Sequence, residues 1–168
     1  MRIAGIDPGY AIVGCGAVEY ANNNFKLIEY GAITTKAGEP FTQRLLTIDE
    51  EVRAFFERVK PEALAIEKLF FNSNQKTAID VAQARGVLVV NAVRAGIPVF
   101  EYTPLQVKMS VVGYGRAEKK QVMEMTRIIL GMEKVPKPDD AADALAMAIC
   151  HAHSAVSLLG GVMNSVRR

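Results

Sequence analysis

The chain has 168 residues and half of them are apolar, which is enough to bury one substantial hydrophobic core. Two cysteines are too few for a disulfide scaffold, and no apolar stretch approaches the roughly 20 residues that a membrane-spanning helix needs. The first residues also lack the long apolar core of a signal peptide. We therefore expect a cytoplasmic protein with no membrane partner, and the net charge of +2 by itself excludes no other class of partner.

The first part of the chain predicts three strands in an antiparallel meander. Strand-like segments cover residues 1–6, 11–20 and 25–35, with turn residues between them. A helix with apolar residues at helical spacing follows between Pro40 and Pro61. A short apolar strand over residues 63–66 then ends at Glu67.

The later segments alternate between helices and a strand. We expect a long helix over residues 77–95, a strand ending at Glu101, helices over 104–111 and 117–130, and a last helix from Pro138 to about His153. This order predicts an α/β fold with a mixed sheet. We predict one domain over residues 1–155, followed by a loosely ordered tail over residues 156–168.

Two of the predicted buried strands end in an acid, Asp7 in the first case and Glu67 in the second. Ligand sites in open α/β sheets gather at the carboxyl ends of strands, so these two carboxylates are candidates for a shared site. Taken singly, each acid is more simply explained as a turn residue.

Asp140 and Asp143 place two further carboxylates three residues apart, on one face of the last predicted helix. The neighbouring residues, 141–149, are apolar on almost every side, which is typical of a buried helix. Burying two like charges together is costly unless a cation compensates them. Alternatively, these acids only cap the helix and interact favourably with its dipole. Taken by itself, the motif is explained equally well in this way.

Asp7, Glu67, Asp140 and Asp143 together form a set of hard oxygen donors. Carboxylates combined with water favour magnesium or manganese over zinc. Two such ions can activate a water molecule and stabilise the leaving oxygen of a phosphodiester. The set therefore predicts metal-dependent phosphodiester hydrolysis.

Six segments resemble, in order, the RuvC family of Holliday junction resolvases. They are 3–9 (IAGIDPG), 65–71 (AIEKLFF), 82–87 (AQARGV), 102–108 (YTPLQVK), 111–119 (VVGYGRAEK) and 140–146 (DAADALA). The resemblance covers nearly the whole chain. It implies a ribonuclease H-like fold, with a central mixed five-stranded sheet (three antiparallel strands first, then parallel strands) flanked by helices on both faces.

The resemblance also implies a DNA endonuclease that resolves four-way junctions by paired, symmetric cuts in recombination and repair. The family's metal-binding acids match Asp7, Glu67, Asp140 and Asp143. The family implies two Mg²⁺ ions in each active site, with Mn²⁺ able to substitute. It further implies a homodimer and cooperation with the RuvA–RuvB branch-migration complex.

Residues for DNA contact also follow from the resemblance. Phe70 is the expected stacking residue for an unpaired base, Lys108 and Lys119 are expected on the DNA-binding face, and Lys76 and Arg116 are further candidates. If the resemblance is set aside, a phenylalanine is more often a core residue and a lysine is more often a solvated surface residue.

A twofold dimer would supply two active sites with the symmetry of the junction. The predicted helix 77–95 is apolar enough to serve both the core and a dimer contact, and its apolar residues are Ile79, Ala82, Leu88, Val89, Ala92 and Val93. Two other functions have some support. The opening motif is also typical of actin-like nucleotide-binding phosphotransferases, which need a second such domain, and a basic surface would suit a non-catalytic junction-binding module.

Overall fold

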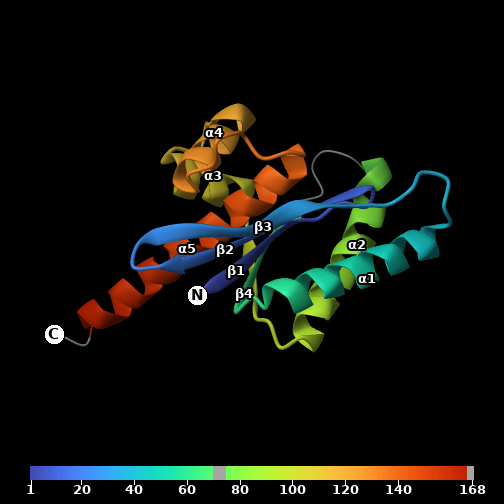
Figure 1. The fold of residues 1–168 in the computed structure, drawn as a ribbon, viewed down its shortest axis with the longest axis horizontal. Helices are drawn as coiled ribbons and strands as arrows, with labels where there is room; N and C mark the ends of the chain where they lie inside the picture. The colour runs from blue at the N-terminus through green and yellow to red at the C-terminus, as the bar shows by residue number, and fades with distance from the viewer. Residues whose placement is uncertain (70–74, 166–168) are drawn as a thin grey trace.

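A computed structural model describes residues 1–69 and 75–165, which form a five-stranded sheet with helices on both faces (Figure 1). The strands are β1 (Arg2–Asp7), β2 (Ile12–Ala21), β3 (Asn24–Thr34), β4 (Ala63–Glu67) and β5 (Val99–Tyr102). The helices are α1 (Phe41–Val59), α2 (Gln75–Arg94), α3 (Pro104–Val112), α4 (Lys119–Ile129) and α5 (Asp139–Ser165).

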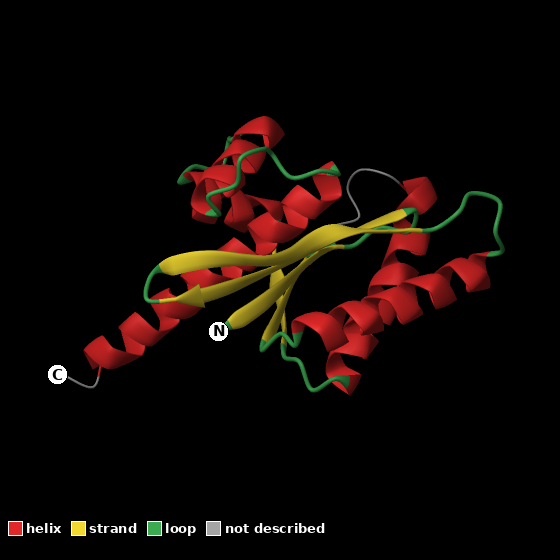
Figure 2. Ribbon diagram, in the orientation of Figure 1, coloured by secondary structure: helices red, strands yellow, loops and turns green. Residues whose placement is uncertain are grey.

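The strands lie in the order β3-β2-β1-β4-β5. The first three strands form an antiparallel meander, and β4 and β5 then extend the sheet in parallel with β1. Figure 2 shows the long β2–β3 ribbon reaching beyond the shorter strands. The predicted fold class, a mixed five-stranded sheet with helices on both faces, is confirmed.

Each face of the sheet carries its own hydrophobic core. Helices α1 and α2 pack on the face that buries Ala4, Ile6 and Ile66. Helix α5, with α3 and α4 beside it, packs on the face that buries Ile3 and Ala65. Because side chains alternate along a strand, the residue that ends β1 and the residue that ends β4 both belong to the α5 face.

Glycines allow α5 to approach β1 and β2 closely. A Cβ atom added at Gly5 would lie 1.8 Å from the carbonyl oxygen of Ala144, and one added at Gly14 would lie 2.0 Å from that of Asp140. No larger residue fits at these two positions unless the helix moves. The first turns of α5 are therefore fixed directly against the centre of the sheet.

The last helix is longer than its sequence predicts. We expected it to end near His153, before the pair Gly160-Gly161, but α5 continues to Ser165. Each helical glycine costs only about 1 kcal/mol, and no proline follows to stop the helix, so the glycine pair does not end it. The predicted division into a domain over 1–155 and a tail stays a prediction. None of the helices in the described part of the chain combines the length and apolarity that crossing a bilayer requires.

Candidate active site

Asp7 and Glu67 end adjacent parallel strands. The register of β1 and β4 pairs Ile6 with Ile66, so the two acids that follow lie side by side at the carboxyl end of the sheet. Their carboxyl groups are close enough for each to shift the pKa of the other. The sheet thus brings together two acids that are 60 positions apart in the sequence.

Helix α5 brings the other two acids to the same place. Its close contact with β2 at Gly14 holds the backbone of Asp140 beside the strand that pairs with β1. Asp143 lies one turn further along and faces Asp7, and the negative charges of both α5 acids act on Asp7. The structure thus brings these acids close enough for their charges to act on Asp7, and their assignment as a metal site stays a prediction.

A cavity of about 200 Å³ lies between these acids and helices α3 and α4. Its lining residues are Asp7, Glu67, Pro104, Val107, Lys108, Lys119, Val122, Asp143, Ala146 and Met147. Three acids, two lysines and several apolar side chains thus share its wall. Asp140 does not line this cavity.

Burial and mutual repulsion make the acids hard to ionise together. The pKa of Asp7 is raised from 3.8 to about 8, first by burial and then by the negative charges of Asp143, Glu67 and Asp140. The pKa values of Glu67 and Asp143 are also raised, chiefly by burial. At neutral pH and without a bound cation, the raised pKa therefore favours the protonated form of Asp7.

Lys119 supplies the positive charge that faces this group. Its ammonium nitrogen lies 2.8 Å from Oδ2 of Asp143. Burial alone would lower the pKa of Lys119, but the hydrogen bond and the charge of Asp143 raise it. The same lysine lowers the pKa of Asp7 and of Glu67.

The donor chemistry of the site fits a hard divalent cation. All the converging donors are carboxylate oxygens, and buried carboxylates in such proximity need positive compensation. Among the described residues, no three acid, histidine or cysteine side chains already stand close enough to hold one ion together. Asp143 is engaged by Lys119 and Asp7 by Glu67, so an ion would have to replace both contacts.

The predicted DNA-contact residues have different positions. Lys108 and Lys119 line the cavity, whereas Arg116 is exposed outside it. Phe70 lies outside the described residues, and so does the side chain of Lys76, whose backbone belongs to α2. The roles of all five residues stay predictions.

The sequence analysis missed the glycines that position α5 and the apolar wall of the cavity. Gly5 and Gly14 interrupt otherwise apolar strands, and a glycine inside a strand commonly marks a close approach of another backbone. That signal was available in the sequence. The wall formed by Val107, Val122 and Met147 had no comparable signal, because apolar helix residues are usually core.

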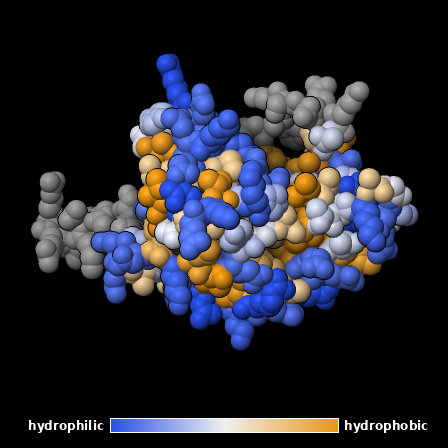
Figure 3. All heavy atoms as spheres, turned by 45° about the horizontal axis from the view of Figure 1, so that its top comes forward, coloured by the Kyte–Doolittle hydropathy of each residue, from blue (hydrophilic) through white to orange (hydrophobic). Residues whose placement is uncertain are grey.

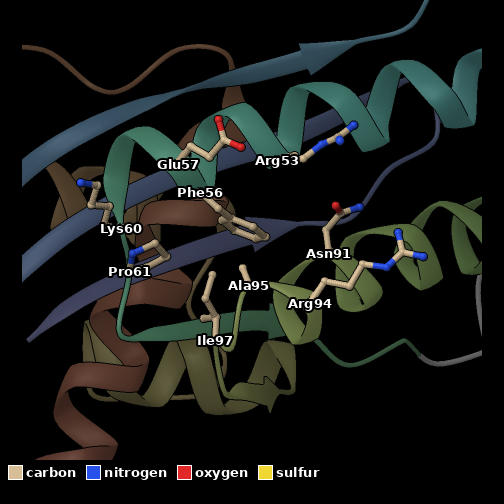
Figure 4. A pocket seen from close by; sticks show the side chains of 9 residues that line it. All are labelled: Arg53, Phe56, Glu57, Lys60, Pro61, Asn91, Arg94, Ala95 and Ile97. Atoms are coloured by element: carbon tan, nitrogen blue, oxygen red, sulfur yellow. The ribbon is translucent and has the colours of Figure 1, made fainter.

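A second and larger cavity, of about 450 Å³, lies between the last turns of α1 and α2 (Figure 4). Pro61 and Ile97 place it next to the amino ends of β4 and β5, at the opposite edge of the sheet from the acids. Its basic side chains are Arg53, Lys60 and Arg94. Lys60 and Arg94 lie at helix C-termini, where the helix dipole favours basic residues. Arg53 pairs with Asp49 at 3.0 Å, so none of the three charges needs a ligand to explain it.

A mixed sheet of this order, with acids at the ends of its two central parallel strands and on the helix across them, is typical of ribonuclease H-like nucleases. The sequence model of the family described as "Crossover junction endodeoxyribonuclease RuvC" matches residues 3–151. The chain belongs to this RuvC family, whose members are metal-dependent nucleases. Membership of this family favours neither of the two alternative functions, the actin-like phosphotransferase and the non-catalytic junction-binding module.

Individual relatives agree with the family match. The crossover junction endodeoxyribonuclease RuvC of Caldanaerobacter subterraneus subsp. tengcongensis is 54% identical over 154 residues, which cover 92% of this chain and 93% of the relative. The solved structure of Thermus thermophilus RuvC is 38% identical, with a TM-score of 0.86 over 94% of this chain and 96% of that one. The same protein in complex with a Holliday junction substrate is 39% identical, with a TM-score of 0.87 over 92% of this chain and 94% of that one.

Proposed function

We propose that this chain resolves Holliday junctions by metal-dependent hydrolysis of one phosphodiester at each of two active sites. The observation that carries the proposal is a cavity lined by Asp7, Glu67 and Asp143, which come from three distant segments, and by two lysines. The junction complex of the T. thermophilus relative supports the choice of substrate.

Asp7, Glu67, Asp140 and Asp143 would hold two Mg²⁺ ions, and Mn²⁺ would substitute for them. When bound, such ions polarise a phosphodiester and activate a water molecule for attack. The apolar wall of the cavity limits the water that reaches the acids, which strengthens the electrostatic interactions within the site.

Lys108 and Lys119 have the position to bind the phosphate backbone next to the acids. Without a cation, the carboxylates would repel a phosphate, and Asp143 would keep Lys119 engaged. Once the acids bind metal, Lys119 is free to contact the phosphate instead. Phosphate contacts of this kind orient the strand and carry no base specificity.

Further DNA contacts belong to the same proposal. Phe70 would stack on an unpaired base, and Lys76 and Arg116 would contact the backbone. Figure 3 turns the α3–α4 side toward the viewer and shows hydrophilic and hydrophobic side chains interspersed over that face. Exposed basic residues at the start of α4 and in the loop before it include Arg116, Lys119 and Lys120, which would suit a phosphate backbone.

The deciding experiment compares the wild-type chain with Asp7→Asn on a four-way junction while Mg²⁺ is titrated from zero. Wild type should give paired, symmetric nicks only when the metal is present. Asp7→Asn should lose more than about 100-fold in nicking rate, because a metal ligand is removed. It should bind the junction about as tightly as wild type in EDTA, because the raised pKa leaves Asp7 largely uncharged at neutral pH when no metal is bound. Unchanged nicking by the variant would exclude the assigned site.

We also propose that the second active site comes from a second copy of this chain. Exposed residues of α2 form a stripe, spaced alternately four and three residues apart, as in a helix–helix seam. They are Ile79, Gln83, Gly86, Val90 and Val93. Ile79 and Val93 expose about two thirds of their surface, at 66% and 65%, whereas Leu88 and Ala92 of the same helix are fully buried. The helix thus has one face for the core and another for a partner.

By family resemblance, the dimer would act in the cytoplasm with the RuvA–RuvB branch-migration proteins. The test is junction cleavage with and without purified RuvA and RuvB, in which the proteins should accelerate nicking. Equal rates with and without them, together with no co-sedimentation on the junction, would remove this part of the proposal.

A further inference from the structure

We propose that Arg85 is a positioning residue for Glu67, and that it fixes the backbone of this acid in the orientation that metal binding needs. The inference rests on the proposed function, since it concerns one of the four acids. Arg85 lies in α2, and its Nε donates a hydrogen bond to the backbone carbonyl oxygen of Glu67 at 3.2 Å. Its terminal nitrogen Nη2 donates to the carboxylate of Glu101 on β5. Only 20% of the Arg85 side chain is exposed.

The carbonyl that Arg85 binds lies where the sheet ends. Glu67 is the last residue of β4, and the next amide, that of Lys68, donates to the carbonyl oxygen of Tyr102 at 2.9 Å. The peptide group between Glu67 and Lys68 is therefore held at both of its polar atoms. Tyr102 of β5 holds its N–H, and Arg85 of α2 holds its C=O.

Fixing this peptide group restricts the backbone dihedrals of Glu67, and with them the direction of its side chain. Without Arg85, this carbonyl would lose the side-chain donor that the described residues give it, and the peptide group would be held only through its N–H. A metal ligand that must meet ions also held by Asp7 and Asp143 tolerates little such rotation. The contact thus links Glu67 to a long helix that is packed on the other face of the sheet.

The guanidinium group suits this task because it donates in two directions at once from a rigid plane. Glu101 lies opposite Ile66 in the pairing of β4 with β5, one position before the pair Glu67–Tyr102. The two acceptors of Arg85 are therefore on adjacent strands at the same edge. A lysine has one ammonium group and lacks this fork.

A simpler account is that Arg85 only forms an ion pair with Glu101, and three variants separate the two accounts. Arg85→Met removes both contacts, Glu101→Gln weakens only the ion pair, and Arg94→Met removes an arginine from the far end of the same helix. Mn²⁺ binding to the full chain is measured by calorimetry without DNA, after thermal melts show that each variant is folded.

We expect Arg85→Met to bind Mn²⁺ about 10-fold more weakly, as is usual when a residue that orients a metal ligand is lost. Glu101→Gln should weaken binding by no more than about 3-fold, because Glu101 is 47% exposed and an ion pair with an exposed partner contributes little. Arg94→Met should bind like wild type. In nicking assays, Arg85→Met should lower kcat with an unchanged KM for the junction, and added Mn²⁺ should restore part of the rate.

The inference would be overturned if Arg85→Met bound Mn²⁺ within about 2-fold of wild type. It would also be overturned if Glu101→Gln weakened Mn²⁺ binding as much as Arg85→Met does. If Arg85→Met does not fold, Arg85→Lys takes its place, because it keeps the charge and loses the fork. Weaker Mn²⁺ binding by folded Arg85→Lys supports the inference, and unchanged binding overturns it.

Asp7→Asn separates this inference from the proposed function. If Asp7→Asn binds Mn²⁺ like wild type, the site itself is wrongly assigned, and the inference about Arg85 fails with it. If Asp7→Asn loses Mn²⁺ binding while Arg85→Met keeps it, only the inference about Arg85 fails.

Discussion

The ammonium nitrogen of Lys119 lies 2.8 Å from a carboxylate oxygen of Asp143, which joins the first residue of α4 to the second turn of α5. A lysine at a helix N-terminus opposes the helix dipole, so Asp143 compensates an unfavourable position. The pair also supplies a positive charge next to Asp7 and Glu67. The acid that would bind metal and the lysine that would bind phosphate thus neutralise each other in the free protein.

Lys119→Met should have opposite effects on metal binding and on catalysis. Removing the positive charge abolishes its repulsion of a divalent ion and frees Asp143, so calorimetry without DNA should show Mn²⁺ binding as tight as in wild type or several-fold tighter. Junction nicking should nevertheless fall by about 10- to 100-fold, because a charged contact to the reacting phosphate is lost. Lys134→Met, which removes an exposed lysine before α5, is the control for net charge. Weaker Mn²⁺ binding by Lys119→Met would contradict the prediction.

The stability of the metal-free protein should fall as the pH rises from about 4 to about 8, partly because of Asp7. The pKa of Asp7 is about 8 in the folded chain and near 3.8 when the chain unfolds, so the folded state binds the proton more tightly. Deprotonation across that window therefore favours unfolding. Each unit of difference is worth about 1.4 kcal/mol, so the full effect is of the order of several kcal/mol.

Asp7→Asn, which does not titrate, should lack this loss of stability. Urea unfolding in EDTA at several pH values should show that the free energy of unfolding of the variant increases relative to that of wild type as the pH rises. Added Mg²⁺ should stabilise wild type more than the variant. Glu50→Gln alters an exposed acid and is the control. A stability difference between Asp7→Asn and wild type that does not change between pH 4 and pH 8 would contradict the pKa of Asp7.

Gly14→Ala should damage the site from outside it. The added methyl group would lie 2.0 Å from the carbonyl oxygen of Asp140, so α5 must move away from β2. Urea unfolding should show a loss of about 1–3 kcal/mol, as is typical of overpacking, and Mn²⁺ binding should weaken with it. Gly31→Ala, in β3, places the same methyl group in open space and should change neither measurement. Normal Mn²⁺ binding by Gly14→Ala would mean that the position of Asp140 is unimportant.

Val93→Glu should separate the two copies of the chain. It places a charge on the exposed stripe of α2, where a second copy would bury it, so sedimentation should shift from dimer to monomer. The isolated monomer should cut single strands without the paired cuts that resolution needs. Ile128→Glu alters a similarly exposed apolar residue on α4 (54% exposed) and should leave the dimer intact. A Val93→Glu chain that remains dimeric would place the interface elsewhere.

The order of the helices and strands could be predicted from the sequence, and so could the local placement of the four candidate acids. Strand and helix periodicity are local properties, and Asp7 and Glu67 each end a short apolar strand that is recognisable from its own residues. The spacing of Asp140 and Asp143 likewise places them on one helix face without reference to the rest of the chain. The predicted end of α5 was wrong, because two glycines weaken a helix without necessarily ending it.

Only the tertiary structure decided how these parts meet. It paired Lys119 with Asp143, fitted α5 against Gly14, joined Arg85 to the carbonyl of Glu67, and divided the apolar residues of α2 between the core and an exposed stripe. Each of these contacts joins segments that are far apart in the sequence. Their geometry depends on how whole faces of helices and sheet pack together, and that packing sums many weak contacts that no local pattern contains.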